Sequence, residues 1–166
     1  MEAHLQTMPA RANPVPPGTR VLFLGHASTI IEMDGVRLVT DPVLRRLVGP
    51  LYRRIPQPLS GPLIDPDAIL ISHLHLDHYD PRSLRLFRRD TPVLVPSGAG
   101  LSLRWSGFRE VHELRPGERL RLGPVEIVGT EGVITVANPF LATRHEVVRC
   151  RVGDGPDEAI DVDSPW

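Results

Sequence analysis

The sequence of 166 residues contains no lysine and a single cysteine, so all 19 basic residues are arginine. This bias weakens the case for reading local arginine clusters as phosphate-binding sites. The single cysteine, Cys150, excludes an internal disulfide bond and fits a reducing cytoplasm. No apolar run approaches the roughly 20 residues of a membrane-spanning helix, and residues 1–18 lack the pattern of a secretory signal. We therefore expect a cytoplasmic protein with no membrane span.

The composition is that of an ordinary globular protein. Hydrophobic residues make up 41% and charged residues 23% of the chain, which argues against the disordered and membrane classes. The formal net charge of −1 gives no electrostatic case for nucleic acid or an anionic membrane as a bulk partner. Because a chain of this length buries roughly 70% of its unfolded surface in one core, we expect a single domain.

Short apolar runs alternate with helix-like stretches through residue 130. Asp34 and Gly35 separate two such runs and predict a tight hairpin. Asp80 precedes Pro81 and predicts a helix N-cap. The order of the elements favours an α/β fold, called α+β in some schemes. The predicted strands are residues 20–24, 30–33, 36–39, 68–71, 93–95, 110–114, 119–122 and 125–128, and the predicted helices are residues 81–89 and 98–105.

Three other segments have little regular pattern. Residues 1–18 are rich in proline and predict a flexible N-terminal segment, and residues 153–166 predict a disordered acidic tail. Residues 44–66 contain five prolines and predict a long irregular loop. We therefore expect the folded domain to span residues 19–152.

A dense group of candidate metal ligands follows the apolar run 68–71. The group consists of His73, His75, Asp77 and His78. In an extended segment alternate side chains share one face, so we expect the first three ligands to converge and the intervening Leu74 and Leu76 to enter the core. Imidazole and carboxylate groups are typical ligands of zinc and similar metals. Such a metal lowers the pKa of its bound water to about 7 and produces hydroxide for hydrolysis.

The pattern His-x-His-x-Asp-His at residues 73–78 resembles the signature loop of the metallo-β-lactamase superfamily. Three further segments resemble the branch that contains the N-acylphosphatidylethanolamine phospholipase D-like and ascorbate-phosphate lactonase-like hydrolases. They are GHAST at residues 25–29, TDP at residues 40–42 and PVLVP at residues 92–96. The resemblance covers about residues 19–130.

The resemblance implies a four-layer αββα sandwich and a metal-dependent hydrolase. His73 and His75 would hold a first metal ion, and Asp77 and His78 a second, with Asp77 also exchanging a catalytic proton. The implied cofactor is one or two zinc ions, with manganese or iron as alternatives. The implied reaction is attack of metal-bound hydroxide on a phosphodiester, lactone or related ester, so the expected partner is a small molecule, anionic in the case of a phosphodiester.

Two further residues have a functional and a structural interpretation. His26 lies in the GHAST segment, where it either borders the site or forms a local hydrogen bond. Asp41 either orients a ligating histidine or belongs to a turn. A set of arginines either receives an anionic substrate or lies in a solvated loop, which we favour. The set is Arg45, Arg46, Arg53 and Arg54.

The sequence departs from the superfamily pattern after about residue 130. The pattern requires another histidine for the first metal, an aspartate that bridges both metals, and a final histidine. His145 is the better candidate for a ligand, because His112 lies in a predicted strand where it suits a structural role. No aspartate is assigned as the bridge. We favour a chain that is truncated or altered here, for instance by a shifted reading frame, over a shortened relative with fewer ligands.

The altered C-terminal part leaves alternative functions open. If only the N-terminal part of the sandwich is complete, the chain is a catalytically impaired fragment with half of the metal site, and it exposes apolar surface. A nucleic-acid-processing member of the same superfamily is the other alternative, which the charge disfavours, so no nucleic acid is expected as a partner. The substrate, the oligomeric state and the number of metal ions stay open.

Overall fold

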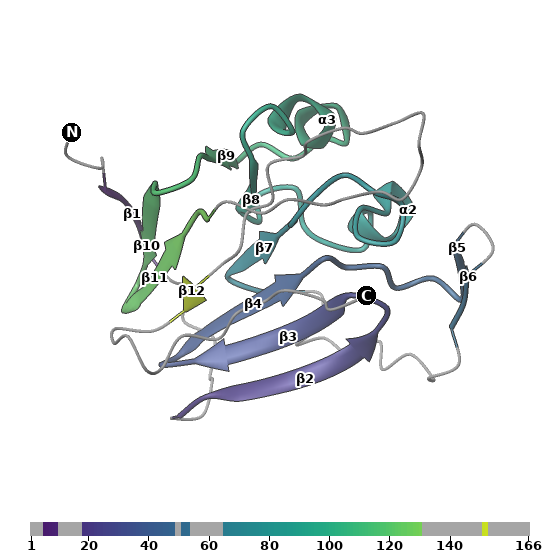
Figure 1. The fold of residues 1–166 in the computed structure, drawn as a ribbon, viewed down its shortest axis with the longest axis horizontal. Coiled ribbons are helices and arrows are strands. Elements are labelled where there is room, and N and C mark those ends of the chain that lie inside the picture. The colour runs from purple at the N-terminus through teal and green to yellow at the C-terminus, as the bar shows by residue number, and fades with distance from the viewer. Residues whose placement is uncertain (1–4, 10–17, 49–50, 54–64, 131–150, 153–166) are drawn as a thin grey trace.

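A computed structural model describes residues 5–9, 18–48, 51–53, 65–130 and 151–152. These residues form two larger β-sheets, a small two-stranded sheet and one layer of helices (Figure 1). The strands are β1 (Leu5–Met8), β2 (Arg20–Gly25), β3 (Ser28–Met33), β4 (Val36–Thr40), β5 (Leu47–Val48), β6 (Leu51–Tyr52), β7 (Ala68–Leu70), β8 (Val93–Pro96), β9 (Val111–Leu114), β10 (Arg119–Leu122), β11 (Val125–Val128) and β12 (Arg151–Val152). The helices are α2 (Pro81–Leu84) and α3 (Gly100–Trp105).

The larger sheet has six strands in the order β2-β3-β4-β7-β8-β9. Strands β2, β3 and β4 form an antiparallel meander, and β4, β7, β8 and β9 run parallel. The predicted hairpin turn is confirmed, since Asp34 and Gly35 both have positive φ angles, of 47° and 84°. Because the carboxyl ends of parallel strands lie at one edge of a sheet, the segments after β4 and β7 are brought together there.

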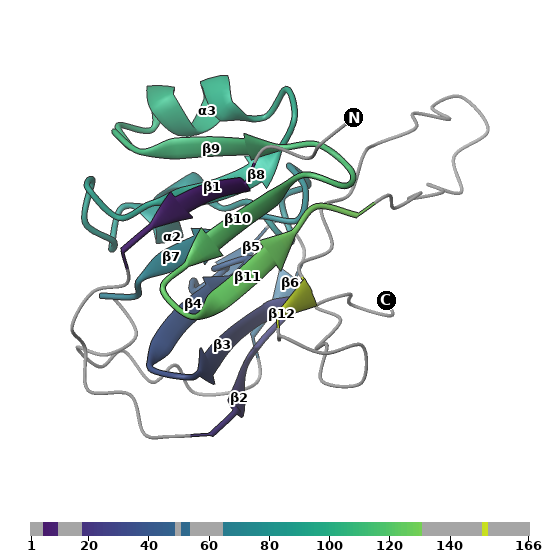
Figure 2. The same ribbon diagram turned by 90° about the vertical axis from the view of Figure 1, so that its left-hand side faces the viewer.

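Two apolar cores hold the layers together. The first lies between the larger sheet and a four-stranded sheet of order β1-β10-β11-β12, with Leu38 and Leu70 meeting Leu120 and Ile127. The second lies between the larger sheet and the helices, and it includes Leu103. The layer order is therefore sheet, sheet, helices, as Figure 2 shows with the four-stranded sheet in front. The described residues therefore form the two sheets and one of the two helical layers of the αββα sandwich that the resemblance implies.

Two predictions about irregular segments are wrong. Residues 5–8 lie in the segment predicted to be flexible, yet they form β1, which pairs in parallel with β10. Met8 is buried in the first core, and this burial stabilises the strand. Within the predicted irregular loop, β5 pairs antiparallel with β6. Residues 54–64, 131–150 and 153–166, which include Cys150 and the predicted acidic tail, lie outside the described residues.

Helix α2 begins as predicted but ends early. The Asp80 side chain accepts a hydrogen bond from Ser83 N and caps the helix, with Pro81 in its first turn. After Leu84 the chain continues in three-residue turns, in which Phe87 N donates to Leu84 O at 3.3 Å. These turns carry Phe87 into the second core. Among the described residues no helix is long and apolar enough to cross a membrane.

Candidate metal centre

The ligand-rich loop after β7 is a tight turn, which corrects the prediction of an extended segment. The amides of His78 and Tyr79 both donate to the carbonyl oxygen of His75, at 3.0 and 2.6 Å. Leu74 and Leu76 are 38% and 68% exposed, so they do not enter the core. Convergence of the ligands therefore depends on the turn, which returns the chain toward His73.

The turn brings His73, Asp77 and His78 together. One potential ligand atom from each lies within 4.8 Å of those of the other two. The rings of His73 and His78 have centroids 4.0 Å apart and are buried, whereas the Asp77 side chain is 51% exposed. Two imidazoles and one carboxylate suit a first-row divalent metal, and an exposed side leaves room for water or substrate. The donor set therefore fits the metal that the resemblance implies.

His75 lies beside this group of three. Its ring is partly buried and meets the ring of His73 edge-on, with centroids 4.7 Å apart. The pairs expected from the resemblance were His73 with His75 and Asp77 with His78. The closest grouping in the structure instead takes His73 from the first pair and both members of the second.

Asp41 lies directly behind the two buried histidines. Its Oδ2 atom is 2.8 Å from His78 Nδ1, and it accepts a hydrogen bond from Ser72 Oγ at 2.6 Å. Its Oδ1 atom accepts from the backbone amide of Ser72 at 2.7 Å. A carboxylate can only accept in these contacts, so we assign the proton of His78 to Nδ1. The Nε2 atom of His78 then keeps its lone pair for a ligand.

Ser72 extends this arrangement to His73. Because the Ser72 hydroxyl donates to Asp41, its oxygen is left to accept from His73 Nδ1, which lies 3.0 Å away. With the proton on Nδ1, the lone pair of the His73 ring lies on Nε2. Sequence reasoning did not single out Ser72, although its position immediately before the first ligand was the available signal.

Asp41 is itself held in place by its surroundings. It is buried with a φ angle of 39°, a left-handed conformation that is uncommon for a residue other than glycine. Its amide donates to Leu70 O at 2.8 Å, and its carbonyl accepts from Ser28 Oγ at 2.7 Å. Ser28 Oγ in turn accepts from Val43 N at 2.8 Å. These contacts join the ends of β4 and β7 beneath the histidines.

His26 lies after β2 in an unusual environment. It has a φ angle of 53° and follows Gly25, where the pairing with β3 is irregular. Its Nε2 atom is buried and has no hydrogen-bond partner among the described residues. Burial lowers the pKa of His26, the positive charge of Arg53 lowers it further, and the negative charge of Asp77 opposes both. His26 is therefore near enough to Asp77 to respond to its charge.

The arginines after β4 do not all lie in a solvated loop. The favoured interpretation as solvated side chains is therefore wrong for two of them. Arg53 is buried, donates to the carbonyl oxygens of Leu24 and Val43, and has its pKa lowered by burial. Arg45 forms two hydrogen bonds with Asp80, at 2.7 and 2.9 Å. Arg46 is exposed and donates to Tyr52, and Arg54 lies outside the described residues.

The two remaining histidine candidates do not join the group. His112 is partly buried in β9, with Nε2 3.6 Å from a Glu110 oxygen. His145 lies outside the described residues. Within the part of the chain that the structure describes, His73, Asp77 and His78 form the one group of three that could hold a metal.

The geometry agrees with what the sequence matches. A model of the beta-lactamase superfamily domain matches residues 20–147. The chain is 29% identical over 113 residues to the UPF0173 metal-dependent hydrolase MK1542 of Methanopyrus kandleri, and the alignment covers 68% of this chain and 44% of that protein. It is 32% identical over 90 residues to N-acyl-phosphatidylethanolamine-hydrolyzing phospholipase D 1 of Caenorhabditis elegans, covering 49% of this chain and 25% of the relative.

A solved structure shares the fold. CmlA, a diiron beta-hydroxylase from Streptomyces venezuelae, superposes with a TM-score of 0.65 and 26% identity, over 87% of this chain and 29% of CmlA. The chain spans less than half the length of the two curated relatives described above. The family model covers more than half of the chain and includes the whole ligand-rich loop. The chain belongs to the metallo-β-lactamase superfamily.

Proposed function

We propose that the chain supplies the metal-binding part of a hydrolase that cleaves a phosphodiester, a lactone or a related ester. The observation that carries the proposal is the group of His73, Asp77 and His78, backed by Asp41. The name of the Methanopyrus relative, a metal-dependent hydrolase, supports the reaction type. The name of the Caenorhabditis relative supports a phosphodiester, because a phospholipase D hydrolyses one.

His73, Asp77 and His78 would hold the metal, with His75 next to them as a further candidate ligand. The metal, when bound, acts as a Lewis acid that activates water and polarises the substrate oxygen. The proton on Nδ1 of each buried histidine is held by Ser72 or Asp41, which fixes the ring orientation. The Asp77 carboxylate, which is half-exposed, would take up a proton from the attacking water.

His26 would contact the substrate. Its lowered pKa favours the neutral ring at pH 7, in which one nitrogen donates and the other accepts. The buried Nε2 atom has no partner among the described residues, and burying a polar atom without a partner is costly. A substrate oxygen that accepts from this atom would remove that cost. We propose His26 as a hydrogen-bond donor to the substrate at the rim of the site.

We propose zinc as the metal, with manganese or iron as alternatives. Iron is kept as an alternative because CmlA, which shares the fold, is a diiron protein. We also propose a cytoplasmic location, because a single cysteine suits a reducing compartment. His145 is proposed as a further ligand. A catalytically impaired half-site is the second candidate, because the described residues bring only three candidate ligands together in one group.

The test is metal analysis and hydrolysis by the purified full chain. We expect bound zinc, hydrolysis of bis-p-nitrophenyl phosphate or of a lactone, and loss of both in His73→Ala and Asp77→Ala. His112→Gln is the matched control, because His112 lies outside the ligand group, and it should keep metal and activity. Tight metal without turnover would favour the impaired half-site. Equal metal content and equal activity in the parent, His73→Ala and Asp77→Ala would refute the proposal.

A further inference from the structure

The outer surface of the helical layer is strongly cationic, although the chain as a whole is not. Residues 81–109 contain six of the 19 arginines and one of the 20 acidic residues, in a chain of net charge −1. The bias toward arginine over lysine does not explain this, because it would not remove acidic residues from one segment. The charge is therefore segregated along the sequence.

The structure gathers these arginines with exposed apolar side chains. On α3 the residues Leu101, Arg104 and Trp105 have the spacing of one helix face, and Leu103 on the other face is buried. Trp105 is 81% exposed, the largest value among the exposed large hydrophobic residues described. We define the helical face as the exposed residues Arg82, Arg85, Leu86, Arg88, Leu101, Arg104, Trp105 and Arg109.

Direct contacts join the two parts of this face. Arg109 N donates to Arg89 O at 2.9 Å, and the Arg89 guanidinium lies 5.1 Å from the centre of the Phe108 ring. Tyr79, just before α2, has its hydroxyl 3.2 Å from Ser106 Oγ. Both helices cover the same side of the larger sheet (Figure 1). The segments that follow α2 and α3 therefore form one surface.

Part of the cationic charge on this face is not neutralised locally. Arg88 pairs with Asp90, and Arg104 pairs with Glu113. Among the described residues, no acidic side chain forms an ion pair with Arg82, Arg85 or Arg109. A surface that combines exposed tryptophan and leucine with three arginines lacking an acidic partner among the described residues matches the interface of an anionic lipid bilayer. There, apolar side chains enter the headgroup region and arginine meets lipid phosphates.

We infer that the helical face docks the protein on an anionic membrane surface. A duplex nucleic acid would also attract the arginines, but the exposed aliphatic side chains of Leu86 and Leu101 have no role there, whereas a bilayer buries them. Helix α2 begins three residues after His78, so docking brings the candidate metal centre near the lipid headgroups. The inference goes beyond the proposed function, because it requires neither a metal nor turnover.

The experiment is sedimentation of the full chain, stripped of metal with a chelator, with vesicles. We expect binding to vesicles of phosphatidylcholine mixed with phosphatidylglycerol, weakening as salt rises, and little binding to phosphatidylcholine alone. The variant Arg82→Gln/Arg85→Gln/Arg109→Gln should bind about fivefold more weakly per arginine, on the order of 100-fold in all. A second variant, Trp166→Phe, leaves Trp105 as the remaining tryptophan, whose emission should shift to shorter wavelength on the mixed vesicles.

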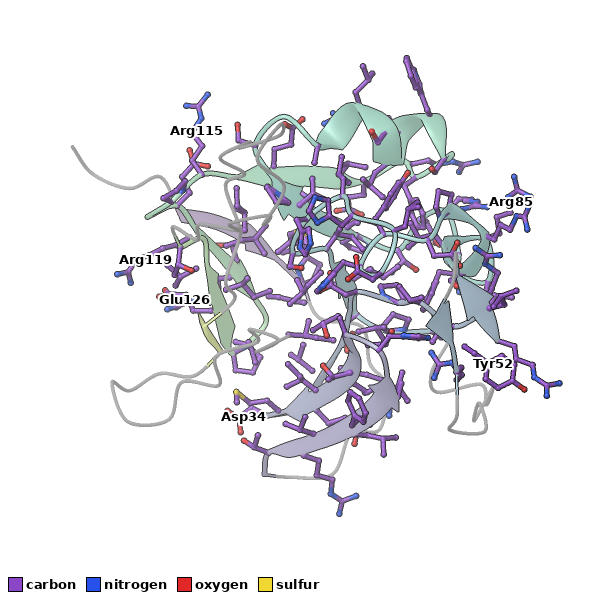
Figure 3. The ribbon with its side chains drawn as sticks, turned by 45° about the vertical axis from the view of Figure 1, so that its right-hand side comes forward. Asp34, Tyr52, Arg85, Arg115, Arg119 and Glu126 are labelled. Atoms are coloured by element: carbon purple, nitrogen blue, oxygen red, sulfur yellow. The ribbon has the colours of Figure 1, made fainter. Side chains whose placement is uncertain are left out.

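The matched control is Arg115→Gln/Arg119→Gln/Arg121→Gln, which removes the same charge from exposed positions around β10. Figure 3 shows Arg115 and Arg119 on the side of the molecule opposite Arg85. The control should bind vesicles like the parent. The inference is overturned if both triple variants lose the same affinity, if the mixed vesicles bind no better than phosphatidylcholine, if Trp105 emission does not shift, or if duplex DNA binds more tightly than the vesicles.

Discussion

The Nδ1 atom of His78 lies 2.8 Å from Oδ2 of Asp41, a residue 37 positions earlier in the chain. Both residues are buried, and the contact joins the segment after β4 to the turn after β7. It fixes which nitrogen of His78 carries the proton, and so which nitrogen is presented to a metal. The candidate centre therefore depends on the pairing of β4 with β7 as much as on the ligand-rich loop.

Asp41→Asn should weaken metal binding by a factor of roughly 10 to 100. The amide has nearly the shape of the carboxylate, but its nitrogen cannot accept hydrogen bonds from His78 or Ser72. Zinc affinity measured by calorimetry on the full chain checks this. The control is Asp34→Asn, in the exposed hairpin turn after β3, which should leave zinc affinity unchanged. Equal affinities in both variants would show that Asp41 does not orient the ligand.

His26→Asn should reduce turnover by on the order of 100-fold while metal content stays the same. Asparagine tolerates the left-handed backbone at this position, so the turn should be kept. The shorter side chain cannot bring a donor to the place of the unpartnered Nε2 atom. Steady-state kinetics together with metal analysis checks the prediction. A fall in metal content as large as the fall in rate would instead mark His26 as a ligand.

Asp80→Ala should destabilise the fold by about 1–2 kcal/mol through loss of the helix cap alone, with a further loss from the Arg45 contact. Burial works to raise the pKa of Asp80, but the hydrogen bonds from Arg45 and Ser83 outweigh it and hold the pKa below its usual value. Urea unfolding gives the free energy. The exposed Asp90, which pairs with Arg88, provides the control Asp90→Ala, where we expect little change.

Glu113→Gln should flatten the pH dependence of stability in the acid range. The hydrogen bond from the Gly98 amide lowers the pKa of Glu113 most, burial opposes this, and Arg104 lowers it further. A depressed folded pKa contributes stability that is fully present above the unfolded value of 4.5 and is lost as the pH falls through the folded value. Thermal unfolding at several pH values should show a smaller acid loss in Glu113→Gln than in the exposed control Glu110→Gln.

The sequence determined the features that depend on neighbouring residues. The hairpin at Asp34-Gly35 was predictable because these residue types tolerate the positive φ angles that a tight turn requires. The cap at Asp80 was predictable because the amide that it accepts from, Ser83 N, lies only three positions later. The same holds for the ligand-rich loop, which places three histidines and an aspartate within six positions after a buried strand.

The tertiary structure decided which of these residues meet. The turn at His75 grouped His78 with His73 and Asp77, and long-range contacts buried Arg53 and set Asp41 and Ser72 behind the histidines. Residues 5–8 became a strand because β10 offered a free edge and an apolar core for Met8. Such outcomes depend on burial and on partners distant in the sequence, and local pattern does not contain that information.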